Sequence, residues 1–506
     1  MTNNPAQTLD PRRWKALGVI ALVQFMLVLD ITVVNVALPH IQTDLHFSRA
    51  GLAWVVDGYV LTAGGLLLLG GRLGDLLGRR RMFIGGVLLF AVASAASGAA
   101  VNPTMLVASR FVQGMAEAVA SPAAFGLVAL LFTEPKERAK AIGIFGGVAG
   151  LGGTLGPVIS GLLISVASWR WIFFVNIPIG IFAAVVTLRL VSESRAARVV
   201  DAARTRPDFA GAILGTAGLV GIVYGFIAAG NHPWGSTQVV VSLGAGAVAL
   251  AAFVARERSA ADPLVPHGFL SNRTRVSANV ANLFFASVFF TVFYLLTLYL
   301  QQVEHYSTIE TGLAYLPFGV VIGLGIAVSS SLITRVGLKP LLFAGSLFVA
   351  AGVLLLSRIS VHGSYIGETL PALVVLAFGS GLSFAAFGNA SMHDVSGQDA
   401  SLASGIQSTS QQVGGAVGLA LLATLALRHA TSSIAHGAAA AGAYTQGTVL
   451  AFRLGAVVAL VGALIIALSP MATADEVRAA AADAERAGVE SEPESARPRG
   501  LEPVTV

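Results

Sequence analysis

The sequence contains no cysteine among its 506 residues, and charged residues make up only 11% of it. The lack of cysteine excludes disulfide bonds, thiolate metal sites and cysteine nucleophiles. A soluble protein would carry about 25% charged residues. No stretch matches the phosphate-binding pattern G-x-x-x-x-G-K-[ST], and the nine histidines are scattered without the spacing of metal ligands. The sequence therefore predicts no enzyme, no nucleotide-driven motor, no metal and no cofactor.

Hydrophobic residues are abundant instead, at 55%, together with 57 glycines and 19 prolines. A membrane-spanning helix needs about 20 mainly apolar residues. We therefore predict an all-α polytopic membrane protein, and a polar N-terminus that leads directly into a full-length span predicts no cleavable signal peptide. The chain has fourteen predicted spans, at about 16–38, 52–70, 82–101, 105–131, 139–164, 171–190, 209–229, 238–255, 277–300, 311–333, 340–358, 369–390, 403–427 and 448–469.

Lysine and arginine are distributed unevenly between the two sides of these spans. With fourteen spans, both termini share one side. That side carries 25 of the 31 lysines and arginines, the other side carries five, and Arg110 lies inside a span. Because positively charged loops stay in the cytoplasm, we predict a multi-pass protein of the cell membrane with both termini cytoplasmic. The net charge of +5 reflects these loops, so no nucleic-acid partner is expected.

A short pattern recurs in the two halves of the chain. Residues 71–81 read GRLGDLLGRRR, and residues 331–339 read SLITRVGLK, which matches at a constant offset of 259 with Thr334 in place of Asp75. Such a repeat indicates a duplicated unit. The predicted sections are a cytoplasmic N-terminus (1–15), a six-helix bundle (16–190), two inserted transmembrane helices (209–255), a second six-helix bundle (277–469) and a disordered cytoplasmic tail (472–506).

The first of these stretches is expected to form a tight cytoplasmic turn between two spans. Its pattern, G-x-x-x-D-x-x-G-R-[RK], resembles the loop between helices 2 and 3 of transporters of the major facilitator superfamily. The resemblance implies a major facilitator fold and a cytoplasmic gate formed by Gly71, Asp75, Gly78, Arg79 and Arg80. An ordinary positively charged loop is the alternative.

Three carboxylates lie clearly inside predicted spans: Asp30, Asp57 and Glu117. An aspartate at a span centre costs about 2.5–3.5 kcal/mol on insertion scales, so such residues are functional by default. Asp30 lies in LDITVVNVALP, which resembles the first-helix motif of fourteen-helix drug:proton antiporters. The resemblance implies a proton-coupling role for Asp30, with Thr32 and Asn35 as polar neighbours. A carboxylate that is paired structurally with another helix is the alternative.

The other two acids leave their roles open. Asp57 would either attract a cationic substrate or be a solvated residue at the mouth of the pathway. Arg110 and Gln113 belong to an R-x-x-Q-G stretch that resembles the helix 4 motif assigned to proton transfer in these antiporters, and they share a helix face. Glu117 lies where the family commonly has a small residue. It would be a second proton site, an anchor for a cationic substrate or a salt-bridged structural acid.

The fifth predicted span carries the motif that resembles the antiporter signature G-x8-G-x3-G-P-x2-G-G. Gly152, Gly156, Pro157 and Gly161 match it, and Ser160 replaces one glycine. Glycines at this spacing allow close helix packing, and a proline in a helix frees a carbonyl and bends the helix. In the family this motif marks exporters, so the resemblance implies export rather than uptake.

Polar and aromatic residues of the second half complete the candidate substrate site. Gln407, Gln411, Phe289 and Tyr294 join Gln113 as candidates, with packing or lipid-facing roles as the alternative for the aromatic residues. The resemblance implies a monomeric transporter in the lipid bilayer that exports hydrophobic or cationic drugs or antibiotics, driven by the proton gradient. A dedicated exporter of one natural product and a non-transporting membrane sensor or scaffold are the alternatives.

Overall fold

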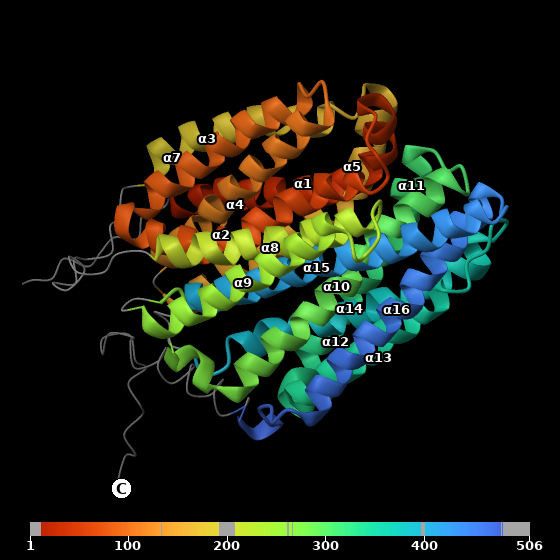
Figure 1. The fold of residues 1–506 in the computed structure, drawn as a ribbon. Coiled ribbons are helices and arrows are strands. Elements are labelled where there is room, and N and C mark those ends of the chain that lie inside the picture. The colour runs from red at the N-terminus through yellow and green to blue at the C-terminus, as the bar shows by residue number, and fades with distance from the viewer. Residues whose placement is uncertain are drawn as a thin grey trace, which may run out of the picture.

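The computed structural model describes residues 12–132, 134–191, 208–260, 263–265, 267–395, 400–476 and 478. Within them, fourteen helical stretches are long and apolar enough to cross a membrane, which confirms the predicted number of spans. Nearly all of the predicted N-terminal section 1–15 and most of the predicted tail 472–506 lie outside the described residues. The part of the chain that the structure describes forms an elongated bundle of helices without strands (Figure 1).

Seven helices form the group that we call the first half. Within it α2 and α3 both pack on α4, α1 packs on α5, and α3 packs on α7. The short helix η1 (Gly51–Ala53) leads into α2. The helices are α1 (Arg13–Leu45), α2 (Trp54–Leu77), α3 (Arg79–Gly98), α4 (Pro103–Leu131), α5 (Pro135–Val166), α6 (Trp171–Phe174) and α7 (Asn176–Leu190).

The second half is the group in which α10 packs on α15 and α16, and α14 packs on α12 and α13. The inserted pair, α8 (Phe209–Ala229) and α9 (Thr237–Ser259), lies between the two halves, where α8 contacts both α2 and α15 (Figure 1). The domain boundaries stay predictions. The helices of the second half are α10 (Arg273–Gln302), α11 (Thr308–Ala314), α12 (Leu316–Val336), α13 (Leu338–Leu356), α14 (Leu370–Ser391), α15 (Ala400–Ala435) and α16 (Ala440–Leu468).

The two ends of the bundle differ in how the halves meet. We call the end with Arg13 and Leu468 the terminal end, and the end where α1 finishes at Leu45 the far end. At the far end, Arg49 Nη1 donates a hydrogen bond to Gln302 Oε1 (2.8 Å). Further side-chain bonds join the C-terminal parts of α1 and α10 at the same end. The halves are therefore tied together by polar contacts at the far end.

A single glycine separates the helices at each of the two repeated turns. Gly78 joins α2 to α3 with φ 105°, and Gly337 joins α12 to α13 with φ 82°. Only glycine adopts such dihedrals without strain. The prediction of a turn over residues 71–81 is therefore too long, because residues 71–77 continue α2 and residues 79–81 begin α3. The equivalent turns agree with the predicted offset between the halves.

The residues after α16 pack onto the turn between α12 and α13. Lys339 Nζ donates to the carbonyl oxygen of Ser469 (3.0 Å), and Arg478 Nε donates to that of Thr334 (2.8 Å). A Cβ atom added to Gly337 would lie 2.8 Å from a backbone nitrogen of this segment. The start of the tail is thus bound to the second half. The structure describes a short helical stretch in this part of the tail, at residues 474–476 and 478.

Replacing Gly78 by alanine should destabilise the protein. A residue with a Cβ atom at this dihedral costs about 1–3 kcal/mol, so the variant should unfold at a lower temperature than the wild type. Gly85→Ala is the matched control, because a Cβ atom there meets no atom within 4 Å. The measurement is the loss of monodisperse protein on heating in detergent. Equal unfolding temperatures for the two variants would show that the turn tolerates a side chain.

Candidate functional site

The centre of the first half is an ion pair between Asp30 on α1 and Arg110 on α4. Their side chains are 0% and 1% exposed, and Arg110 Nη1 donates to Asp30 Oδ2. Arg110 Nε donates to the carbonyl oxygen of Val55 on α2 (2.8 Å). The guanidinium carbon lies 4.3 Å from the centre of the Tyr59 ring. Each charge thus has an oppositely charged partner inside the membrane, and the contacts of the pair join three helices.

Two amide groups donate hydrogen bonds to the other oxygen of this carboxylate. Asp30 Oδ1 accepts hydrogen bonds from Gln113 Nε2 (3.2 Å) and from Asn176 Nδ2 on α7 (2.9 Å). Gln113 Nε2 also donates to Ser94 Oγ on α3 (2.9 Å), and Gln113 Oε1 accepts from Ser97 Oγ (2.9 Å). The network ties α1, α3, α4 and α7 to one carboxylate.

Close helix packing positions this network. Asn102 caps α4 by accepting a hydrogen bond from the backbone N–H of Met105 (2.8 Å), which begins the helix two turns before Arg110. A Cβ atom on Gly114 would lie 2.1 Å from Thr62 Oγ1, so the glycine lets α4 approach α2 closely. Small residues at helix contacts are the usual means of close approach in membranes. This contact brings the Arg110 side chain within reach of the α2 backbone.

Sequence reasoning identified Asp30, Arg110 and Gln113 but missed Asn176 and Ser94. The first three belong to motifs with a recognisable spacing. Asn176 is the first residue of α7, and Ser94 lies in an apolar helix, so neither stands in a pattern that would single it out. Only their burial and their shared contact with the Asp30 network identify them.

Glu117 lies on the same helix as Arg110 and is only 7% exposed. It follows Arg110 by seven residues, so the two side chains share one face of α4. Within the described residues Glu117 forms no salt bridge, and its Oε2 has no hydrogen-bond partner. The structure therefore offers no support for a salt-bridged structural role. Glu117 is an acid with unused hydrogen-bonding capacity beside the ion pair.

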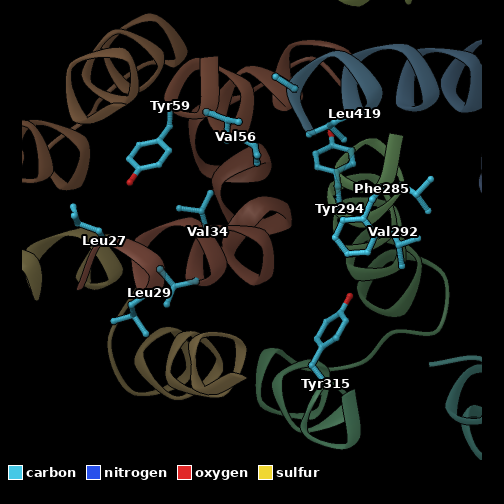
Figure 2. Packing of buried hydrophobic residues seen from close by; sticks show 14 of the residues in the cluster. Leu27, Leu29, Val34, Val56, Tyr59, Phe285, Val292, Tyr294, Tyr315 and Leu419 are labelled. Carbon is cyan, nitrogen blue, oxygen red and sulfur yellow. The ribbon is translucent and has the colours of Figure 1, made fainter. Parts of the chain in front are cut away.

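Asp57 on α2 is 0% exposed, so it is not solvated in this conformation. In the described part of the chain neither of its carboxyl oxygens has a hydrogen-bond partner. Gly64 lies two turns after Asp57 on the same face of α2, and a Cβ atom there would lie 2.8 Å from the Cβ atom of Gln412 on α15. Asp57 therefore faces the second half, whereas Tyr59 contacts Arg110 inside the first half. Figure 2 shows Tyr59 and Tyr294 on separate sides of the packed core. Asp57 is thus a buried acid at the boundary between the halves.

The second half contributes an aromatic cluster. The ring of Phe289 on α10 lies 4.9 Å from that of Phe293, 6.0 Å from that of Phe318 on α12 and 5.4 Å from that of Phe384 on α14, measured between centres. Phe289 itself is only partly buried, and Tyr294 is buried. Three helices therefore join in one apolar surface around Phe289.

The other predicted substrate residues lie apart from the Asp30 network. Asn35 Nδ2 donates to the carbonyl oxygen of Ile31 within its own helix (3.4 Å). Gln407 and Gln411 are half-buried on α15, and the backbone oxygen of Gln407 accepts from Asn282 Nδ2 (3.2 Å). The structure thus separates these polar groups from the ion pair, although they remain candidates for contact with a substrate.

The glycines of the fifth span lie at close helix contacts. A Cβ atom added to Gly152 would lie 3.1 Å from the nearest atom of α1, and one added to Gly156 would lie 1.9 Å from it. A Cβ atom added to Gly161 would lie 2.5 Å from the backbone of α11. The carbonyl oxygen of Pro157 would lie 2.5 Å from a Cβ atom on Gly312. The motif therefore packs α5 on α1 within the first half and on α11 of the second half.

The predicted gate residues pair at the terminal end. Asp75 Oδ1 accepts hydrogen bonds from Arg79 Nε (3.0 Å) and Nη2 (2.8 Å), and Arg79 Nη1 donates to the carbonyl oxygen of Gly126 on α4 (3.0 Å). Arg80 Nη2 donates to the carbonyl oxygen of Leu188 on α7 (2.8 Å). These bonds hold the start of α3 against α4 and α7.

A cleft of about 160 Å³ lies beside this pair and reaches the second half. Gly71, Asp75 and Arg79 line it from the first half, and Leu402 and Gly405 line it from α15. The described residues contain no group of three or more histidine, aspartate or glutamate side chains that could hold a metal ion.

A sequence model of the Major Facilitator Superfamily matches residues 20–419. The chain belongs to the Major Facilitator Superfamily. It is 39% identical over 464 residues to the puromycin resistance protein of Streptomyces alboniger, which covers 90% of each chain. It is 38% identical to the lincomycin resistance protein of Streptomyces lincolnensis, over 82% of this chain and 84% of that one. Family membership makes the chain a transporter rather than an enzyme, as predicted.

Solved structures agree with the family at the level of the fold. A bacterial homologue of the human lysosomal transporter Spinster, in an inward-facing and occupied conformation, superposes with a TM-score of 0.64. The alignment covers 91% of this chain and 97% of that one at 16% identity. The predicted all-α major facilitator fold in a multi-pass membrane protein is thus confirmed.

The unfolding temperatures of single and double variants should reveal the interaction between Asp30 and Arg110. Arg110→Gln leaves the Asp30 carboxylate buried without its partner, and breaking a buried pair costs about 3–5 kcal/mol. Combining it with Asp30→Asn removes both charges and keeps polar groups of similar size. We expect the double variant to unfold at a higher temperature than Arg110→Gln alone in detergent. A double variant no more stable than the single one would mean that the two charges do not interact.

Proposed function

We propose that this transporter exports hydrophobic, often cationic, antibacterial compounds across the cytoplasmic membrane in exchange for protons. It works as a monomer by alternating access between its two halves, with the proton gradient as its energy source. The observation that carries this proposal is the Asp30–Arg110 pair: a fully buried carboxylate whose protonation would cancel the charge that holds four helices together. The antibiotic-resistance relatives support the choice of substrate class.

The proton acts through the partners of Asp30. A proton added to Oδ2 would occupy the oxygen that accepts from Arg110 Nη1 and remove the negative charge of the pair. Arg110 would keep its bond to the Val55 carbonyl and its contact with the Tyr59 ring, both on α2. Protonation would therefore loosen α1 from α4 while α2 and α4 stay joined. This change of helix contacts is how proton binding would favour one conformation over the other.

The substrate would bind between acidic and aromatic groups that belong to different halves. Asp57 lies at the boundary, and Glu117 lies on α4 of the first half with one oxygen unpaired. The cluster around Phe289 offers apolar and π surface from the second half. A lipophilic cation satisfies both surfaces, because a cation is attracted to carboxylates and to aromatic faces. Glu117 serves as a second proton site or as the anchor of the cation.

The terminal end would face the cytoplasm, because it carries the excess of lysine and arginine. In this orientation Asp75 and Arg79 line a cytoplasmic cleft between the halves, and the polar contacts of Arg49 close the far, external end. Rocking of one half against the other would close the cytoplasmic cleft and open the external end. The gate residues would thus latch the cytoplasmic side in one state.

A dedicated exporter of one natural product is the second candidate, because the two relatives named above are resistance proteins for single antibiotics. Growth of cells that express the protein, tested on structurally unrelated drugs, separates the two candidates. Resistance to many of them indicates broad export, and resistance to one compound indicates a dedicated exporter. Proton-linked dye efflux would exclude a non-transporting sensor or scaffold.

Asp30→Asn should abolish the coupling of drug to protons. Everted vesicles are loaded with a pH-sensitive dye and given a proton gradient, and then ethidium and a panel of antibiotics are added. We expect drug-triggered proton release in the wild type and none in Asp30→Asn at matched expression, because asparagine cannot exchange a proton. Asp44→Asn is the control: it removes an acid of the same helix whose ion pair with Arg170 is exposed at the far end.

Two other outcomes of this experiment contradict parts of the proposal. Release by Asp30→Asn would move the essential proton site elsewhere, with Glu117 next to be tested. No release by the wild type with any compound of the panel would contradict broad export and favour a narrow natural-product exporter.

Asp75→Asn should leave folding and insertion intact and lower the transport rate. The substitution weakens the pair with Arg79 on a partly exposed surface, where such a pair contributes only about 0–1 kcal/mol to stability. Its effect should therefore be on the gate. The measurement is the initial rate of dye efflux per folded protein, and Asp475→Asn, in the exposed Arg478 pair of the tail, is the control. Full activity of Asp75→Asn would remove the latch from the mechanism.

A further inference from the structure

The inserted pair is bound to the second half at the far end. Arg428, near the end of α15, donates from Nη1 to the carbonyl oxygens of Ala229 (2.7 Å) and His232 (2.8 Å). The last carbonyls of a helix lack donors of their own, and a cation there is favoured by the helix dipole. Thr424 Oγ1, one turn earlier on α15, donates to the carbonyl oxygen of Phe226 (2.9 Å). Arg428 thus completes the hydrogen bonding of the C-terminus of α8.

The same end of α8 also touches the first half, but through apolar contacts. The rings of Trp54, the first residue of α2, and Tyr224 on α8 lie 6.2 Å apart between centres. A Cβ atom on Gly230 would lie 3.1 Å from the Cβ atom of Ala50 and 3.5 Å from a methyl carbon of Leu427 on α15. The C-terminus of α8 is therefore wedged between the two halves at the far end.

The two attachments differ in kind. The bonds from Arg428 and Thr424 are directional, and those from Arg428 carry a charge, which makes them about twice as strong as bonds between neutral groups. The contacts with Ala50 and Trp54 are ring and methyl contacts without a hydrogen bond in the described residues. If the halves separate at the far end, α8 has to follow one of them. The weaker contact is the one on the first half.

We propose that Arg428 is a positioning residue for transport. It fixes the inserted pair to the second half, so that α8 covers the seam between α2 and α15 while the far end is closed. The pair moves with the second half, and the contact of Tyr224 and Gly230 with Trp54 and Ala50 opens in each cycle. This inference rests on the proposed alternating access, and it assigns to α8 and α9 the task of stabilising the state in which the far end is closed.

Crosslinking tests which contact opens, and the absence of cysteine makes every introduced thiol unique. Gly230→Cys is combined either with Ala50→Cys, which ties α8 to the first half, or with Leu427→Cys, which ties it to the second half. Both pairs are joined by the same short reducible bis-thiol reagent, and the crosslinked fraction is measured by mass spectrometry. We expect loss of efflux for the Ala50 pair, recovery after reduction, and wild-type efflux for the Leu427 pair.

Every other pattern contradicts the proposal. Loss of efflux in both pairs would mean that α8 moves against both halves. Wild-type efflux after both crosslinks would mean that this seam does not open. Loss of efflux after the Leu427 crosslink alone would mean that α8 and α9 move with the first half. Each variant before crosslinking serves as its own control for folding and basal activity.

A second experiment does not require transport and thus separates failure of this inference from failure of the proposed function. Spin labels on Thr43→Cys and Ser432→Cys report the distance between the halves at exposed positions of the far end. We expect Arg428→Gln to shift the distance distribution toward longer values, because α8 loses its hold on the second half. Arg453→Gln, at an exposed position of α16, should leave it unchanged. An unchanged distribution in Arg428→Gln would overturn the positioning role.

Discussion

The arrangement of the first half depends on one charge pair that is out of contact with water. Asp30 and Arg110 are each expensive to bury alone, and they are tolerated because they meet each other and a shell of amides and hydroxyls. The pair and its contacts involve α1, α2, α3, α4 and α7, so most of the first half is organised around a single ion pair. A charge that can be cancelled by one proton is in this way connected to the packing of a whole bundle.

The two halves divide the chemistry unequally. The three buried acids of the spans, Asp30, Asp57 and Glu117, belong to the first half, and the aromatic cluster around Phe289 belongs to the second. A substrate between them would touch ionisable groups on one side and apolar rings on the other. The inserted pair adds a third component, because α8 bridges α2 and α15 and is bound more firmly to the latter.

Much of the fold and part of the site could be predicted from the sequence. Long apolar runs predicted the fourteen spans, and motif spacing identified Asp30, Arg110 and Gln113. The turn at Gly78 was predicted too long, because sequence does not reveal that one residue with a positive φ suffices to reverse the chain. Asn176 and Ser94 could not be predicted, since their role comes from helices that meet only in three dimensions. The burial of Asp57 was likewise undecided, because its depth depends on how α2 packs on α15, more than 300 residues away.

The docked start of the tail bears on the order in which the protein is made. All members of the Asp30 network lie before residue 177, so this network can assemble while the ribosome is still producing the second half. The turn at Gly337 is completed by Ser469 and Arg478, which follow all fourteen spans in the sequence. The first half is therefore able to mature during synthesis, whereas the second half reaches its final contacts only after the last span has been made.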